Sequence, residues 1–177
     1  MGLDVVAHQN IQKLELDTNI IAIDELGADP QFGNYWRVEK HDYFYDHAEG
    51  LDDDAFYSSG DEVARFSAGS YSGYSAFREW LVELVDLANT EEKYKDMLPE
   101  GYEITFFEFD SLCNFSDCDG VIGPVYAQRL HEEFKAFEKI AESVSRHEDH
   151  LYGMYEVYKN FLKAFDMARK NGMVRFT

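Results

Sequence analysis

The chain has 177 residues and a formal net charge of −19, and 45% of its residues are hydrophobic and 16% aromatic. So much apolar and aromatic character excludes a disordered acidic tail, and this length suits one domain that buries roughly 70% of the surface its unfolded form exposes. Because acidic residues outnumber basic residues 35 to 16, the summed field disfavours direct binding to nucleic acid or to an anionic membrane.

Short strands are predicted for the amino-terminal part of the chain. In residues 3–8 and 11–16 the apolar residues are short, often β-branched, and partly alternate with polar ones. This pattern predicts two strands joined as a hairpin. Residues 19–23 predict another short strand and residues 35–39 an extended segment. The stretch 41–60 is rich in Asp, Tyr and Ser and indicates an irregular excursion over the surface.

A strand over residues 63–67 leads directly to the glycine-bearing segment 69–74 and then to a helix. In this helix, apolar residues at spacings of three and four form one buried stripe. The stripe consists of Phe77, Leu81, Leu84, Val85 and Ala88.

Two further long helices are predicted for the carboxy-terminal half. Residues 104–109 form a short apolar run that favours a strand, although periodicity alone does not distinguish it from a helix. Pro124 is suited to the first position of a helix, and a charged break at 146–150 separates this helix from the last one. Gly172 is placed to cap the last helix, and residues 173–176 predict a final strand.

These elements predict an α+β fold over residues 1–177, a single domain in which a small mixed or antiparallel sheet from the N-terminal half packs against three main helices. The chain lacks a run of about 18 apolar residues that would span a bilayer, and its start lacks the basic and apolar regions of a secretory signal. We therefore expect a cytoplasmic protein without membrane contact. Cys113 and Cys118 are too few for a disulfide scaffold, so both are expected as free thiols.

The segment 69–74 is the first candidate ligand site. It lies before a predicted helix, where unpaired backbone N–H groups carry roughly half a positive charge and favour an anion. The side chains expected to bind the ligand are Ser70, Tyr71, Ser72, Tyr74 and Arg78. Their hydroxyls would donate hydrogen bonds, the tyrosine rings would stack on a planar group, and the arginine would hold phosphate. The alternative is a structural turn with a serine cap and aromatic packing.

The stretch 114–124 is the second candidate, because polar groups are concentrated before another predicted helix. Its candidate side chains are Asn114, Ser116, Asp117, Cys118 and Asp119. The Asp117 carboxylate would orient a base or ribose, and N–H groups near Gly120 and Gly123 would meet phosphate. A tight turn with an aspartate cap is the alternative. Catalysis by Cys118 is disfavoured, because its two acidic neighbours oppose thiolate formation.

Two groupings of histidine invite a metal interpretation. Residues 41–47 contain two histidines and two aspartates, but neither a helix nor a strand brings these ligands to one face. His147 and His150 lie three residues apart, which is typical of a solvated, charged helix end. We expect no metal and no other cofactor.

Three segments of the chain together resemble a group of small bacterial and bacteriophage proteins without an established activity. They are the Met-Gly-Leu-Asp start, the GSYSGY motif at 69–74 followed by Phe77 and Arg78, and the NFSDCDGVIGP motif at 114–124. The resemblance extends over most of the chain. It implies a phage or prophage accessory protein that counteracts host defence.

The preferred functional hypothesis is a non-enzymatic binding module, in which the two loops converge on a small phosphorylated, nucleotide-like ligand and sequester a host-defence signal. A second hypothesis is an acidic inhibitor or nucleic-acid mimic that docks on a basic protein partner, motivated by the charge and the acidic stretches 49–54 and 91–96. A third is a hydrolase or transferase that uses Asp117 or Cys118, although spacing alone assembles no base, nucleophile and orienting group. The sequence leaves the oligomeric state open and is compatible with a homo-oligomer.

Overall fold

The computed structural model of the chain describes residues 2–15, 35–38, 40, 44–58, 60, 62–105, 108–116, 119–147 and 152–177. Its fold is α+β, with an antiparallel four-stranded sheet packed against helices, as the sequence predicts. The predicted strand at 19–23 lies outside the described residues.

The four-stranded sheet has the order β4-β1-β6-β5, and every neighbouring pair is antiparallel. Its strands are β1 (Gly2–Gln9), β4 (Glu62–Ser70), β5 (Gly120–Ile122) and β6 (Met173–Phe176). Half of the sheet therefore comes from the carboxy-terminal part of the chain, which corrects the prediction of a sheet built from the N-terminal half. The expected hairpin of 3–8 with 11–16 is also wrong, since β1 pairs with β4 and β6 instead.

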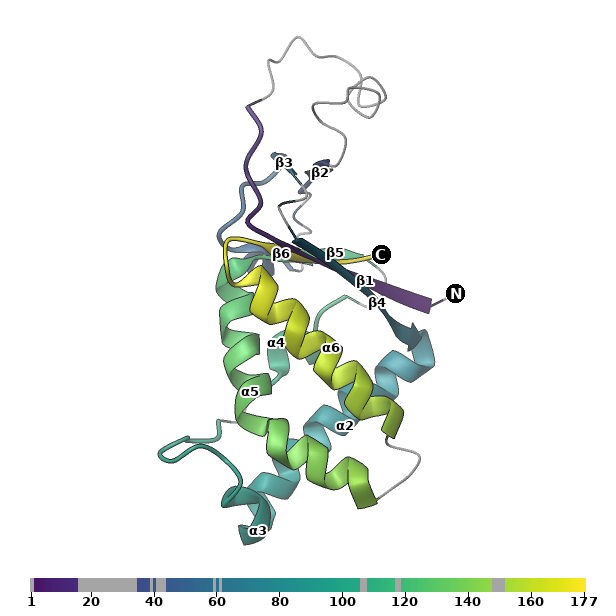
Figure 1. The fold of residues 1–177 in the computed structure, drawn as a ribbon, viewed down its shortest axis with the longest axis vertical. Helices are drawn as coiled ribbons and strands as arrows, with labels where there is room; N and C mark the ends of the chain where they lie inside the picture. The colour runs from purple at the N-terminus through teal and green to yellow at the C-terminus, as the bar shows by residue number, and fades with distance from the viewer. Residues whose placement is uncertain are drawn as a thin grey trace.

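Three main helices cover one side of this sheet, while the small pair β2–β3 lies on the other side (Figure 1). The helices are α2 (Tyr71–Thr90), α5 (Pro124–His147) and α6 (Tyr152–Ala168), and shorter turns form α3 (Glu92–Lys95) and α4 (Asp110–Cys113). The predicted stripe of α2 is buried except for Val85, which is half-buried. The predicted helix start at Pro124 and the strand at 173–176 are confirmed.

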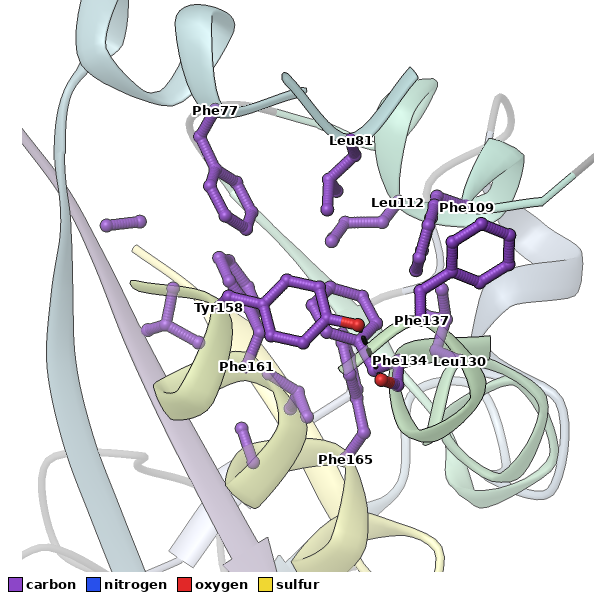
Figure 2. Close-up of a cluster of buried hydrophobic side chains, with 14 of the residues drawn as sticks. Phe77, Leu81, Phe109, Leu112, Leu130, Phe134, Phe137, Tyr158, Phe161 and Phe165 are labelled. Carbon is purple, nitrogen blue, oxygen red and sulfur yellow. Dashed lines mark hydrogen bonds between the residues drawn. The ribbon is translucent and has the colours of Figure 1, made fainter. Parts of the chain in front are cut away.

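Aromatic rings fill the space between the sheet and the helices (Figure 2). The Phe161 ring of α6 lies at the centre of this core and is fully buried. Its neighbours within ring-packing distance are Phe66, Tyr74, Phe77, Phe134, Phe165 and Phe176. The buried hydroxyl of Tyr158 donates a hydrogen bond to the backbone carbonyl of Phe134, so this polar group is satisfied inside the apolar layer.

A second, smaller cluster lies on the opposite side of the sheet. Its residues come from β2 (Tyr35–Arg37), β3 (Phe56–Ser58), β6 and nearby segments, while the 3-10 turn η1 (Tyr45–Ala48) lies between β2 and β3 in the chain. The apolar residues of this cluster are Ile11, Val38, Leu51, Tyr57 and Met173. Because side chains alternate along a strand, β6 contributes Val174 and Phe176 to the main core and Met173 to the smaller one. The stretch 41–60, expected to be irregular, thus includes one strand and one turn of helix.

The predicted strand at 104–109 is wrong for its described residues, none of which is in a strand. The chain turns there, and Phe109 adopts the left-handed conformation (φ 60°) ahead of α4. Its buried ring accounts for the apolar run, because the ring packs edge-on against Phe134 and Phe137. Short apolar runs do not reveal whether they are strands or buried turns.

The end of α6 is closed by Gly172, as the sequence predicts. Its N–H donates to the Ala168 carbonyl at 2.7 Å, after Asn171 has taken the left-handed conformation (φ 56°). A Cβ atom on Gly172 would lie 1.9 Å from the His8 carbonyl oxygen, so the close approach of α6 to β1 requires glycine. Among the described residues, no helix has the length and apolar character needed to cross a membrane.

Replacing Phe161 by alanine is expected to lower the free energy of unfolding by about 3–5 kcal/mol, because it leaves a cavity among rings that have little room to collapse. Urea denaturation followed by circular dichroism measures this loss. The matched control is Val82→Ala on α2, whose side chain is 56% exposed and whose change should stay within about 0.5 kcal/mol. Equal effects of the two substitutions would contradict this description of the core.

Candidate anion-binding site

The first predicted loop is not a loop in the structure. Strand β4 continues to Ser70, and α2 begins at Tyr71. The Ser70 hydroxyl accepts a hydrogen bond from the Gly73 N–H at 3.1 Å and lies 3.1 Å from the Ser72 hydroxyl. Ser70 therefore acts as a helix cap, which was the structural alternative for this segment.

The larger side chains of this segment serve the fold. Tyr74 is fully buried and packs against the Phe77, Phe161 and Phe176 rings, so its predicted stacking on a ligand is wrong. Tyr71, in contrast, is 39% exposed. Whether it contacts a ligand stays a prediction.

Arg78 links the first predicted segment to the second. Its guanidinium donates to the backbone carbonyls of Cys113, at 3.1 Å, and Phe115, at 3.2 Å. It also lies over the Tyr74 ring, with the guanidinium carbon 4.7 Å from the ring centroid. The two segments are thus neighbours, but the cation expected to hold phosphate between them is occupied by the protein's own carbonyls.

The second predicted segment forms a network of side-chain caps. The Asn114 amide donates to the Asp110 carboxylate, and the Asp119 N–H donates to the Ser116 hydroxyl at 3.2 Å. The Ser116 hydroxyl lies 3.4 Å from Asp119 Oδ1. Asp117 and Cys118 lie outside the described residues. Asp119 lines a cleft.

This cleft is lined by residues of β2, β5 and β6 and by residues next to these strands. It has a volume of about 280 Å³. Its lining residues are Arg37, Asp119, Gly120, Val121, Arg175, Phe176 and Thr177. Two arginines thus face one cavity in a chain with a large excess of acidic residues.

Arg175 is placed in the cleft by the register of the sheet. It pairs with Val6 of β1 on one side and Val121 of β5 on the other, and Arg65 of β4 also pairs with Val6. Laterally paired residues share a face, so Arg65 and Arg175 both lie on the face opposite the aromatic core. The Arg175 guanidinium carbon lies 3.6 Å from the centre of the Trp36 ring.

The environment of Arg175 is unfavourable for a charge without a partner. Burial, and then the positive charge of Arg65, lowers the pKa of its guanidinium, although arginine stays protonated in proteins. Within the described part of the chain, the Arg175 side chain makes no ion pair or hydrogen bond, and it packs against the Trp36 ring. The indole N–H of Trp36 is also buried without a hydrogen-bond partner among the described residues.

The other two charged side chains of the cleft are held by neighbours. Arg37 forms an exposed ion pair with Asp54 at 2.9 Å. Asp119 is oriented by Ser116 next to Gly120, whose φ of 142° and close approach to the Phe115 ring exclude a side chain. The cleft therefore offers two guanidinium groups and one carboxylate, the combination expected for a ligand with an anionic end and a donor end.

Sequence reasoning missed Arg37 and Arg175. A local signal for Arg175 exists: residues 167–177 contain three cations and no carboxylate, in an otherwise strongly acidic chain. Its position between Val174 and Phe176 in a predicted strand also places it on the face opposite two apolar residues. For Arg37 no comparable pattern exists, because its approach to β6 is a long-range contact.

His47 is half-buried among aromatic side chains. Its ring packs against Tyr126, with 4.7 Å between centroids, and against Phe115, at 5.1 Å, and burial lowers its pKa. His41 and Asp42 lie outside the described residues, as do Glu148, Asp149 and His150. Among the described residues, no group of three or more His, Cys, Asp or Glu side chains is placed to hold a metal ion.

The thiol of Cys113 is half-buried and free, and burial raises its pKa to about 11. Such a thiol is protonated at neutral pH and is a poor nucleophile. It therefore does not support an enzyme based on this cysteine.

No protein-family model matches the chain, and no curated protein or solved structure is significantly similar to it. The resemblance to small bacterial and bacteriophage proteins stays a prediction. The function is therefore inferred from the geometry and charges of the cleft.

A buried carboxyl group lies near α4, away from the cleft. Glu133 of α5 is 6% exposed and accepts hydrogen bonds from the Phe109 N–H, at 2.9 Å, and from Arg129 Nε, at 2.8 Å. Both donors favour the charged form, but burial outweighs them and raises the pKa of the carboxyl to about 7. Glu133 thereby holds the left-handed turn at Phe109 against α5.

The raised pKa makes stability depend on pH. Between about pH 4.5 and 7 the folded state binds more protons at Glu133 than the unfolded state, so the free energy of unfolding falls as pH rises through this window. The full contribution is on the order of 3 kcal/mol. In Glu133→Gln this fall should disappear, whereas the exposed neighbour variant Glu132→Gln should retain it. Urea unfolding at several pH values gives the slopes, and parallel curves for wild type and Glu133→Gln would refute the assignment.

Proposed function

We propose that the protein is a non-enzymatic binding module for a small phosphorylated, nucleotide-like ligand, and that the ligand lies in the cleft between Arg37 and Arg175. The observation that carries this proposal is the half-buried guanidinium of Arg175, which has no carboxylate partner among the described residues. In a chain with 35 acidic residues, a cation that forms no ion pair within the described part of the chain is available to an anion from solution.

Phosphate is the anion that this arrangement fits best. The planar guanidinium donates two parallel hydrogen bonds to phosphate oxygens, and such charge-assisted bonds are roughly twice as strong as neutral ones. The Trp36 ring lies against the guanidinium and limits its rotation, so less side-chain entropy is lost on binding. A ligand oxygen would also relieve the cost of a half-buried charge without a partner.

Arg37 is available as a second ligand group despite its ion pair. An exposed pair such as Arg37–Asp54 contributes only about 0–1 kcal/mol, so exchanging the Asp54 carboxylate for a phosphate oxygen costs little. Two guanidinium groups then share the charge of one phosphate. This favours a dianionic phosphate over a carboxylate or a singly charged anion.

The remaining lining residues favour a nucleotide-like ligand over inorganic phosphate. The Asp119 carboxylate repels phosphate but accepts hydrogen bonds from a hydroxyl or amino group, such as those of a ribose or base. The volume of about 280 Å³ is near the lower end for small-molecule sites, which suits a single nucleotide or part of a larger one.

Sequestration fits the cleft better than catalysis does. The described lining residues include no histidine, cysteine or lysine, so a nucleophile with an activating base is not assembled among them. The ligand is then held and released unchanged. For a protein that counteracts host defence, removing a nucleotide signal from solution is sufficient.

Arg175→Gln should weaken ligand binding at least about tenfold, which corresponds to about 1.4 kcal/mol, because the bidentate contact is lost. Isothermal titration with inorganic phosphate and with linear and cyclic mononucleotides measures this effect. A nucleotide should bind more tightly than phosphate, and Asp119→Asn should reduce that difference. Absence of binding by every member of the panel would refute the proposed function.

A control separates the local contact from net charge. Arg146→Gln removes the same charge from an exposed position on α5, where Arg146 pairs with Glu142, and should change the affinity by less than about twofold. Binding should also alter the fluorescence of Trp36, and Trp36→Phe should abolish that change while leaving Trp80. If both arginine variants weaken binding equally, the cleft is not the site.

A further inference from the structure

The cleft lined by Arg37 and Arg175 is called the arginine cleft below. A second cleft, which shares no lining residue with it, runs between α2 on one side and α4 with the turn before it on the other. It has a volume of about 260 Å³. One wall is the face of α2 formed by Val82, Val85, Asp86 and Asn89, and the other is formed by Thr105, Glu108, Asp110 and Cys113. The four α2 residues have the spacing i, i+3, i+4, i+7, so they make one continuous strip along the helix. We call this cleft the α2 groove.

The floor of the α2 groove is apolar although it faces solvent. Val82 is 56% exposed, and Val85 beside it is half-buried. The Asn89 amide donates to the Val85 carbonyl at 3.1 Å. The opposite side of α2 buries its large residues in the aromatic core, whereas Val82 and Asp86 of this strip are exposed.

The rim of the α2 groove is negatively charged and lacks counter-ions. Asp86, Glu108 and Asp110 line it, and none of the three forms an ion pair with a described residue. The Glu108 carboxylate accepts hydrogen bonds from Tyr102 and Thr105, which fixes its position. Arg78 begins the preceding turn of α2, but it is engaged by backbone carbonyls.

We propose that the α2 groove binds an arginine side chain presented by a basic segment of a partner protein. The aliphatic part of an arginine would lie on Val82 and Val85, since long cationic side chains bury their stems on apolar surfaces and keep the charged head at the rim. The guanidinium would then meet Asp86 and Asp110. Its planar fork reaches two carboxylates at once, which a lysine ammonium does less well.

This surface is independent of the proposed nucleotide cleft, and its test uses a different probe. An acetylated, amidated hexa-arginine peptide is titrated into the full-length, ¹⁵N-labelled protein at about 0.15 M salt, where long-range charge effects are screened beyond roughly 8 Å. Chemical-shift changes should concentrate on residues 82–89 and 105–113. A hexa-lysine peptide should bind more weakly at the same salt concentration.

Two variants of equal charge decide whether the groove itself is responsible. Asp86→Lys introduces a cation at the rim and should weaken peptide binding at least about tenfold. Glu83→Lys makes the same change on the same helix about 60° round from Asp86, at a residue that does not line the groove, and should weaken binding less than about threefold. Circular dichroism verifies that both variants keep their helices, and Asp86→Asn gives the same test without adding a charge.

The proposed contact between the aliphatic part of the arginine and Val82 is tested by a separate variant. Val82→Ser shortens the apolar floor without changing charge and should weaken hexa-arginine binding by about threefold, because an aliphatic contact is lost. Shifts spread over the acidic surface, or equal losses in Asp86→Lys and Glu83→Lys, would overturn the proposal and leave only diffuse attraction between opposite charges.

Discussion

Strand β6 pairs with β1 on one side and β5 on the other, and this double pairing fixes both faces of the sheet. On the helical side its Val174 and Phe176 complete the aromatic core, while Met173 and Arg175 point to the other side. A shift of the register by one residue would exchange these faces, placing a guanidinium among phenylalanine rings. The cost of burying that charge is what holds Arg175 at the cleft.

Local patterns in the sequence predict the local parts of the fold. The buried stripe of α2, the start of α5 at Pro124 and the strand at 173–176 depend on spacings within a few residues. The pairing of β1 could not be predicted in this way, because its partners β4 and β6 lie far away in the sequence. The adjacent segment 11–15 looked equally extended, but it lies beside β3, with a bridge between Lys13 and Tyr57 and a hydrogen bond from the Leu14 N–H to the Phe56 carbonyl.

The candidate site shows the same limit for individual side chains. Arg78 and Arg175 both lie over an aromatic ring, so the ring contact does not distinguish their roles. What separates them is the backbone nearby: carbonyls of the 113–115 turn satisfy Arg78, whereas Arg175 lies among strand residues whose carbonyls are used in the sheet. Asp119 was predicted as a ligand group from its loop, and its arginine neighbours come from two distant strands.

The joining of β1 to β6 brings opposite ends of the sequence together, as in the pairing of Val5 with Phe176. Contacts of such long range are slow to form, because the entropy of a large loop must be lost before they form. The arginine cleft is lined by β6 and therefore does not exist in any partly folded chain that lacks this pairing. A ligand that selects this cleft would select, and stabilise, the completed fold alone.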